Sequence, residues 1–510
     1  MTNGRTPSFP THFKPAATAM RDYVLLYING IRHELRNEAV YQALTDFLRY
    51  DLALTGTKVV CAEGDCGSCT VLSGRPENGA MRYQGIDGCI QYLWQLDGRH
   101  VVTVEGLQNN GCLHPVQEAM VESFGSQCGY CTPGFVMGIV AMLEENAPLT
   151  RQGVKDGLTG NLCRCTGYEQ IIDAALALKG KSVTPITERY HDPQMCAELE
   201  ACAQNSVEIS YHESWGHESR NVRIGLPTTL AEAVAFKAQH EKTVVVSGGT
   251  DISVQMNKGK TEPETLLSLV HLQELEGVSE NDGWLKIGAK ATWTDMERAC
   301  GESLPEFRKI IQVFASAQIK NVGTLVGNVG NGSPIADSMP FLFVMDAEVE
   351  LTGTSGSRWV NINHFYHGYK QLELRPDELI TALRLQLPKS NETLKLYKVS
   401  KRKDLDISTF TAGIRMALEG ATISQASVAY GGVGPVVLRL PETEQFLSGK
   451  PLTLETVRKA GKLARREITP ISDVRASKDY RLQLAENILL KFYHEVRQEQ
   501  GWLQPDTLSA

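Results

Sequence analysis

The chain of 510 residues is too long for one compact core, and a prior of about 150 residues per domain predicts three or four units. Hydrophobic and charged contents of 42% and 22% are typical of globular proteins, and a net charge of −8 argues against nucleic-acid binding. No apolar run has the length of a membrane span, and residues 1–20 lack the apolar core of a secretory signal. We therefore expect a cytoplasmic protein.

In chain order, the first elements predict a small α+β domain over residues 21–106, preceded by a disordered segment or extension at 1–20. Strand-like residues 23–28 and 31–35 flank Asn29-Gly30, which is the pattern of a hairpin with a two-residue turn. Residues 43–52 have helical spacing, and a short strand is expected at 100–104.

Helices dominate the predicted second domain, residues 107–182, with apolar positions at helical spacing in 117–124, 134–145 and 170–178. Residues 183–218 are polar and lack a clear period, so they are predicted to be a linker. Strands and helices alternate over 219–390. A further α+β portion is expected over 391–500, ending in a long helix at 479–497, with a tail at 501–510.

Four cysteines form the first cofactor motif. Cys61, Cys66 and Cys69 have the C-x₄-C-x₂-C spacing and Cys89 follows later, which is the plant-type ferredoxin arrangement for a [2Fe–2S] cluster. The glycines at 64 and 67 allow a loop to wrap closely around such a cluster. Zinc or an inert loop is the alternative, but zinc sites usually pair two short cysteine turns.

A second set of four cysteines combines Cys128 and Cys131, in a C-x-x-C pattern, with Cys163 and Cys165. The C-x-x-C pair alone would also suit a thioredoxin-like redox pair, and the spacing leaves zinc open. Helices are expected to start near residues 133 and 167, where their dipoles favour thiolate ligands. Beside a ferredoxin-type loop, a second electron-transfer cluster is the favoured interpretation.

Two glycine-rich turns mark the second half of the chain. Residues 244–251 form a buried strand that leads into a Gly-Gly-Thr-Asp turn, and residues 318–337 carry a denser run of Gly, Thr, Asn and Ser. Such turns expose backbone N–H groups and hydroxyls that can bind a diphosphate. Neither turn is the G-x-G-x-x-G or Walker A pattern, so the residues alone leave a plain turn open beside a nucleotide site.

These motifs resemble those of the small iron–sulfur and FAD subunits of bacterial xanthine dehydrogenases, in the molybdenum hydroxylase (xanthine oxidase) family. The resemblance covers about residues 21–180 and 220–498. Its landmarks are EGDCG at 63–67, LHPVQE at 113–118, GSQCGYCTPG at 125–134, GNLCRCTGY at 160–168, SGGTD at 247–251, and PISDVRAS at 470–477.

The resemblance implies a multidomain α+β fold. Its parts are a β-grasp plant-type ferredoxin domain at 21–106, a four-helix [2Fe–2S] domain at 107–182, a VAO/PCMH-type FAD-binding domain at 219–390, and a C-terminal domain of the CO-dehydrogenase-flavoprotein type at 391–500.

The resemblance also implies roles for single residues. Phe314 would lie near the isoalloxazine ring of FAD, Lys398 near its polar edge, and Tyr369 on the nicotinamide side. Plain packing is the alternative for Phe314 and Tyr369. Gln127 matches a residue that reaches the molybdopterin of a partner subunit. The implied FAD contacts are Val244, Val245, Val246, Ser247, Gly248, Gly249, Thr250, Asp251, Ile252, Phe314, Gly323, Thr324, Gly327, Asn328, Gly330, Asn331, Ser333, Asp337, Leu379, Ile380 and Lys398.

As a whole, the resemblance implies the electron-transfer subunit of a xanthine dehydrogenase. A large molybdopterin-binding subunit would hydroxylate hypoxanthine or xanthine, in a heterotetramer with two copies of each subunit or in a higher assembly. This chain would therefore hold no catalytic residue for that step. Electrons would pass through the Cys128 group and then the Cys61 group to FAD and NAD⁺. The alternatives are the same role for another heterocycle, aldehyde or aromatic substrate, and a stand-alone flavin and iron–sulfur carrier.

Overall fold

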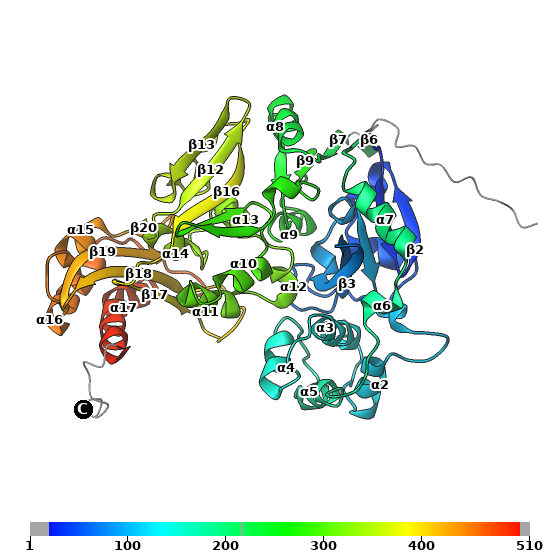
Figure 1. The fold of residues 1–510 in the computed structure, drawn as a ribbon, viewed down its shortest axis with the longest axis horizontal. Helices are drawn as coiled ribbons and strands as arrows, with labels where there is room; N and C mark the ends of the chain where they lie inside the picture. The colour runs from blue at the N-terminus through cyan, green and yellow to red at the C-terminus, as the bar shows by residue number, and fades with distance from the viewer. Residues whose placement is uncertain (1–19, 216–217, 500–510) are drawn as a thin grey trace, which may run out of the picture.

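The computed structural model describes residues 20–215 and 218–499 (Figure 1). It confirms the multidomain α+β fold expected from the sequence. A small sheet domain and a helical domain lie at one end, a larger α/β body lies in the middle, and a strand-and-helix domain forms the other end. The predictions made for residues 1–19 and 501–510 fall outside the described residues.

The first domain is a five-stranded sheet in the order β2-β1-β5-β3-β4, in which β1 and β5 run parallel. The predicted hairpin is confirmed: β1 pairs antiparallel with β2, and the turn residues Asn29 and Gly30 have φ of 49° and 81°. Helical turns at residues 44–51 cover one face. The elements are β1 (Val24–Ile28), β2 (Ile31–Leu35), α1 (Leu44–Asp46), β3 (Thr70–Glu77), β4 (Ala80–Asp87) and β5 (Arg99–Val102).

Four helices form the second domain around an apolar core that includes Phe135, Ile139 and Ile171. Helix α3 begins at a Pro-containing first turn, and its buried face packs against β3 and β4 of the sheet domain. The helices are α2 (Pro115–Glu122), α3 (Thr132–Glu144), α4 (Arg151–Gly157) and α5 (Glu169–Leu176).

The predicted linker at 183–218 differs from the structure, because most of it folds. Helices α6 (Ile186–Arg189) and α7 (Pro193–Cys202) lie there, and Met195 and Leu199 of α7 are buried where this helix packs against β1, β3 and β4 of the sheet domain. Strand β6 (Val207–Trp215) then pairs with β7 (Glu218–Leu226), so this hairpin crosses the predicted boundary at 219. Polar residues on the outer faces hid the short apolar stripe of α7 in the sequence.

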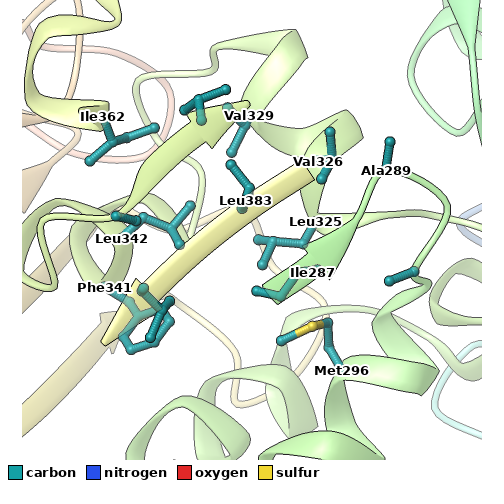
Figure 2. Packing of buried hydrophobic residues seen from close by; sticks show 14 of the residues in the cluster. Ile287, Ala289, Met296, Leu325, Val326, Val329, Phe341, Leu342, Ile362 and Leu383 are labelled. Atoms are coloured by element: carbon teal, nitrogen blue, oxygen red, sulfur yellow. The ribbon is translucent and has the colours of Figure 1, made fainter. Parts of the chain in front are cut away.

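The central domain contains a four-stranded sheet, β6-β7-β9-β8, and a five-stranded antiparallel sheet, β10-β11-β16-β12-β13. A capping box between Thr229 and Glu232 starts helix α8. Leu325, Phe341 and Leu383 meet in the core between helices and the larger sheet (Figure 2). The elements after β7 are α8 (Leu230–Gln239), β8 (Val244–Val246), α9 (Ile252–Asn257), β9 (Thr265–Ser268), β10 (Val278–Asn281), β11 (Trp284–Gly288), α10 (Trp293–Cys300), α11 (Pro305–Phe314), α12 (Ala317–Lys320), α13 (Leu325–Asn331), α14 (Met339–Val344), β12 (Glu348–Gly353), β13 (Gly356–Asn361), β14 (Tyr366–Gly368), β15 (Gln371–Leu372) and β16 (Leu379–Gln386).

The last domain is a four-stranded antiparallel sheet, β17-β18-β19-β20, covered by three helices. Phe410, Tyr430 and Phe492 are buried between the sheet and the long helix α17. Within the part of the chain that the structure describes, no helix is both long and apolar enough to cross a membrane. The elements are β17 (Glu392–Val399), β18 (Phe410–Glu419), β19 (Thr422–Gly431), β20 (Leu438–Arg439), α15 (Pro441–Leu447), α16 (Leu454–Ala464) and α17 (Lys478–Glu499).

Candidate cofactor sites

The inner cysteine site consists of Cys61, Cys66, Cys69 and Cys89. The first three lie on the loop before β3, and Cys89 lies on the turn after β4, which pairs with β3 and so brings the fourth cysteine back to the loop. The side chains of Cys66, Cys69 and Cys89 are buried and that of Cys61 is partly exposed. Cys61 contacts Cys66 and Cys89, and Cys69 contacts Cys89.

Two glycines with positive φ shape the loop of the inner site. Gly64 has φ of 72° and Gly67 has φ of 65°, a region that residues with a side chain rarely adopt. A Cβ atom at Gly67 would lie 2.3 Å from the carbonyl oxygen of Gly160, so only glycine fits there. The backbone N–H of Asp65 lies 3.4 Å from the sulfur of Cys61, which is the type of N–H to sulfur contact that a wrapped cluster loop supplies.

The electrostatics of the inner site favour thiolates at two positions. Contact with Cys66, and then with Cys89, lowers the pKa of the Cys61 thiol, and contact with Cys89 lowers that of Cys69. Burial, together with the nearby Cys69, raises the pKa of Asp87 well above its usual value. A protonated Asp87 adds no negative charge beside the thiolates. The donor set and the loop therefore fit an iron–sulfur cluster.

The outer cysteine site consists of Cys128, Cys131, Cys163 and Cys165. Cys131 contacts Cys163 and Cys128 contacts Cys165. Cys128 and Cys165 are exposed, whereas Cys163 is buried. Cys131 is the N-cap of α3, as the expected helix start near residue 133 required. Across the described residues, no three His, Cys, Asp or Glu side chains are grouped as the ligands of one metal ion would be.

Local hydrogen bonds prepare the outer site for anionic ligands. The N–H and hydroxyl of Thr166 donate to the sulfur of Cys163 at 3.4 and 3.1 Å. Burial acts to raise the pKa of Cys163, but these bonds outweigh it and lower the pKa. Burial and the neighbouring Cys163 raise the pKa of Cys131 to about 12. Four thiols with sulfur-directed donors fit a second cluster.

The two cysteine sites are joined through their backbones. The N–H of Leu162 donates to the carbonyl of Cys66 at 3.0 Å, and the amide of Asn161 donates to the carbonyl of Gly67 at 3.0 Å. A Cβ atom at Gly134, in the first turn of α3, would lie 2.2 Å from that same carbonyl of Gly67. The loop of the inner site is thus packed directly against the helix and loop that carry the outer site.

A cavity of about 400 Å³ lies in the central domain between its two sheets. Both glycine-rich turns line it, as do Phe314 and the start of β16. Of the predicted FAD contacts, those lining the cavity are Val245, Val246, Ser247, Gly248, Gly249, Thr250, Asp251, Ile252, Phe314, Gly323, Thr324, Gly327, Asn328, Gly330, Asn331, Leu379 and Ile380. The backbone of 247–250 and the small residues of α13 leave room for a long ligand such as a dinucleotide.

The remaining predicted residues lie elsewhere. Val244, Ser333, Asp337 and Lys398 do not line this cavity. Instead, the Lys398 ammonium pairs with the buried Asp337 carboxylate at 2.6 Å and donates to Ser408 at 2.9 Å. Tyr369 is 60% exposed, and Gln127 is exposed on the loop before Cys128. The structure therefore separates the predicted set into a lining group and a neighbouring ion pair.

Several residues at these sites carried no sequence signal. Ile319 lines the cavity and also packs against Cys69, Cys89 and Ile90 of the inner site. Trp293 lines the cavity and packs against Phe314 with ring centroids 4.5 Å apart. Ile319 lies within the 318–337 run, but that run was notable for its Gly, Thr, Asn and Ser residues, and Trp293 belongs to no motif. The role of each depends on contacts between distant parts of the chain.

Polar contacts hold the cavity and the inner site together. The amide of Asn257, at the end of α9, donates to the carbonyls of Ala62 and Cys89 at 2.9 and 2.8 Å. Gln318, which is 3% exposed, donates to Thr70 of the sheet domain at 3.2 Å and to Asn161 of the helical domain at 3.0 Å. This three-residue contact, which we call the amide junction, joins three domains where the three sites meet.

Comparisons with known families match three consecutive parts of the chain. Residues 103–176 match a [2Fe-2S] binding domain, residues 220–389 match the FAD binding domain in molybdopterin dehydrogenase, and residues 395–496 match the CO dehydrogenase flavoprotein C-terminal domain. The chain is therefore an iron–sulfur flavoprotein, with [2Fe–2S] and FAD as its cofactors. The matched FAD domain is of the kind described for molybdopterin dehydrogenase, and the last domain is of the kind described for the CO dehydrogenase flavoprotein.

The chain is similar to xanthine dehydrogenase 1 of Arabidopsis thaliana, with 29% identity over 92% of this chain, and to xanthine dehydrogenase of Emericella nidulans, with 30% identity over 93%. It spans 39% of the length of each of these relatives. Among solved structures, it is similar to a chain of a Cu,Mo-CO dehydrogenase, with 29% identity and a TM-score of 0.50, covering 52% of this chain and 94% of that one.

Proposed function

We propose that this chain is the electron-transfer subunit of a xanthine dehydrogenase. It would pass electrons from hydroxylation of hypoxanthine or xanthine on a partner subunit to NAD⁺. The observation that supports this most directly is the order of the sites, because the inner site touches the outer site on one side and the flavin cavity on the other. The relatives with xanthine dehydrogenase activity in their names support the substrate class.

The residues of this chain would hold the cofactors and set their surroundings. [2Fe–2S] clusters supply one-electron transfer, and FAD supplies the exchange between single electrons and a hydride. Cys61, Cys66, Cys69 and Cys89 would bind one cluster, and Cys128, Cys131, Cys163 and Cys165 the other. The cavity-lining turns would bind the diphosphate of FAD through backbone N–H groups.

The residues outside the cavity have separate proposed roles. The pairing of Lys398 with Asp337 would fix the ammonium near the polar edge of the flavin, while Val244 and Ser333 would support the two turns. Tyr369, whose ring is largely exposed, would contact the nicotinamide of NAD⁺. The chain carries no residue proposed to act in hydroxylation itself.

The surface around the outer site supports a molybdopterin-containing partner. Cys128, Cys165 and Gln127 are exposed, and Phe124 and Tyr130 beside them in the chain are 82% and 46% exposed. Large exposed apolar side chains beside a functional site mark a protein interaction surface. We therefore propose that the partner covers this face, in a cytoplasmic heterotetramer with two copies of each subunit, and that Gln127 reaches its molybdopterin.

Co-expression with the partner subunit tests the proposal. The purified complex should contain flavin and about four iron atoms per copy of this chain, and it should reduce NAD⁺ when given xanthine. Recovery of this chain alone, with NADH oxidation but no partner-dependent substrate oxidation, would instead support a stand-alone carrier.

A second candidate is the same electron-transfer role for a different heterocycle, aldehyde or aromatic substrate. The similarity to a chain of a Cu,Mo-CO dehydrogenase supports this second candidate, because that enzyme acts on a different molecule with the same flavoprotein architecture. Assaying the complex with a panel of purines, aldehydes and aromatic heterocycles would separate the two, since xanthine should give the highest kcat/KM under the first proposal.

A further inference from the structure

A second cavity, of about 250 Å³, lies between the sheet domain and the central domain. It adjoins the flavin cavity at the glycine-rich turns, where Ser247, Gly248 and Thr324 line both cavities. Three basic residues line it: Arg75 of β3, Arg99 of β5, and Lys290, which follows β11. They come from both domains, so the cavity exists only when the two domains are assembled.

The two arginines have few protein partners. Among the described residues, the Arg99 guanidinium makes no hydrogen bond and no ion pair. Arg75 has a single ion pair, with Glu77 at 3.7 Å, and its Nε is buried without a hydrogen-bond partner. An unpaired donor of this kind is costly in a protein interior unless a ligand or water satisfies it.

The acidic residues near the cavity are mostly engaged by other groups. Glu276 pairs with Lys290 at 2.9 Å. Asp295 accepts hydrogen bonds from the N–H and hydroxyl of Thr292 and so caps helix α10. Three cations therefore face two carboxylates, one of which is committed to a helix cap.

The cations also repel one another. Burial, followed by the charge of Arg75, lowers the pKa of Arg99 to about 10. Burial lowers the pKa of Lys290 too, and the charges of Arg99 and Arg75 act in the same direction. The charge of Glu276 acts in the opposite direction on both groups, and that of Asp97 on Arg99, but burial outweighs them. Mutual repulsion of this kind means that the three charges lie close together.

We propose that the cavity formed by Arg75, Arg99 and Lys290 binds a small oxyanion of the phosphate class. Arginine guanidinium groups suit phosphate because they present two parallel N–H donors to two oxygens. The side-chain amides of Gln91 and Gln95 also line the cavity and donate to the carbonyl of Gly248, so they hold the adjoining turn in place. A bound anion would neutralise the cluster and join the sheet domain to the central domain beside the flavin turn.

Thermal unfolding of the FAD-loaded, cluster-containing chain tests this proposal, with inorganic phosphate added at constant ionic strength against chloride. The wild-type protein should show a saturable rise in melting temperature. Arg99→Gln should weaken phosphate binding roughly 10- to 100-fold, the loss expected for one hydrogen bond to a charged group. Arg82→Gln is the control, since Arg82 pairs with Glu77 at 3.1 Å but does not line the cavity.

The phosphate-free proteins give a second, independent readout. Because Arg99 is repelled by its neighbours, Arg99→Gln should melt at a higher temperature than the wild type without phosphate and at a lower one with saturating phosphate. A purely structural role for Arg99 predicts a lower melting temperature in both cases, which would overturn the proposal. If Arg99→Gln does not fold, Arg75→Gln takes its place with the same expected loss of binding.

Two further outcomes would also overturn the proposal: a phosphate shift equal to the chloride shift, and a phosphate shift that disappears once FAD is bound. The second would mean that phosphate had occupied the diphosphate position of the flavin cavity. Success or failure here does not depend on which substrate the proposed dehydrogenase oxidises.

Discussion

The inner and outer cysteine sites each consist of four thiols, but the surroundings of the two sites differ greatly. Three cysteines of the inner site are buried, and side chains of the central domain, including Ile319 and Val254, pack against it. Two cysteines of the outer site are exposed, and the helices around it share an apolar core with Leu72, Met81 and Tyr83 of the sheet domain. The inner site therefore depends on the assembly of domains, whereas part of the outer site lies at the surface of the chain.

The largest expected effect comes from removing one ligand of each site. Cys69→Ser should remove the inner cluster and with it more than about 5 kcal/mol of the binding energy that a cluster adds to folding. Cys165→Ser should remove the outer cluster at a smaller cost, because the helical core remains. Iron analysis and urea unfolding of both variants measure the difference, and equal losses of stability would contradict the comparison.

Asp97→Asn should be the next most damaging change, although it lies away from both sites. Asp97 pairs with Arg21 at 2.6 Å and contacts His271 of the central domain at 2.6 Å, fully buried. Neutralising it leaves a buried arginine uncompensated, at a cost of about 3–5 kcal/mol. Glu198→Gln is the matched control, because its pair with Arg32 is on the surface and worth at most about 1 kcal/mol.

The same carboxylate predicts a pH dependence. Burial acts to raise the pKa of Asp97, but hydrogen bonds from His271 and Arg21 outweigh it and hold the pKa below its usual value. A carboxyl with a lowered folded pKa contributes stability above its unfolded pKa and loses it as the pH falls through the folded one. Wild-type stability should therefore fall more steeply below about pH 4 than that of Asp97→Asn, as urea unfolding across pH would show.

Gly67→Ala tests the contact between the two sites. Gly67 has φ of 65° and no room for a Cβ, whereas Gly79 has φ of 78° and open space around it. Gly79→Ala should cost about 1 kcal/mol for its backbone alone. Gly67→Ala should cost more than about 2 kcal/mol, because a clash adds to the backbone strain. Loss of iron from both sites in Gly67→Ala would show that this contact supports both. Equal losses in the free energy of unfolding for Gly67→Ala and Gly79→Ala would contradict this prediction.

The smallest effect on stability is expected at the outer surface. Phe124→Ser removes an 82% exposed ring, so the free energy of unfolding should change by no more than about 0.5 kcal/mol. Its affinity for the proposed partner should fall about tenfold, as for a central interface residue. Ile31→Ser, at a 64% exposed position of the sheet domain, should leave that affinity unchanged. Titration of the partner subunit onto each variant measures this.

Much of the fold followed from local patterns in the sequence. The Asn29-Gly30 turn, the cap at Thr229 and the cysteine spacings depend on residues close together in the chain, so the sequence displays them directly. The two glycine-rich turns allowed a nucleotide site, but the individual residues that line the cavity, such as Phe314 and Ile380, were implied only by the family resemblance. At the outer site, the cysteine spacing alone was compatible with either a zinc ion or an iron–sulfur cluster. The match to a [2Fe-2S] binding domain favours the cluster.

Contacts between distant segments could not be predicted in this way. Helix α7 was predicted to be linker because its apolar stripe is short and is buried only by packing on the sheet domain, far away in the sequence. Arg99 belongs to no motif, and Gln318 begins the 318–337 run without being one of the residue types that made the run notable. The importance of both comes from neighbours far away in the sequence. Likewise, the pairing of Lys398 with Asp337 needs the last domain to dock on the central one.

The amide junction also limits how the chain can be divided for expression. Gln318, Thr70 and Asn161 each come from a different domain, and all three side chains are buried. A fragment ending after the helical domain would expose Thr70 and Asn161 to water, while a fragment beginning at the central domain would expose Gln318 and the apolar side chain of Ile319. Each truncated version should be less soluble than the intact chain, because Ile90 on one side of the boundary and Ile319 on the other lose their apolar contact. Co-expressed fragments should associate through this contact and the amide junction.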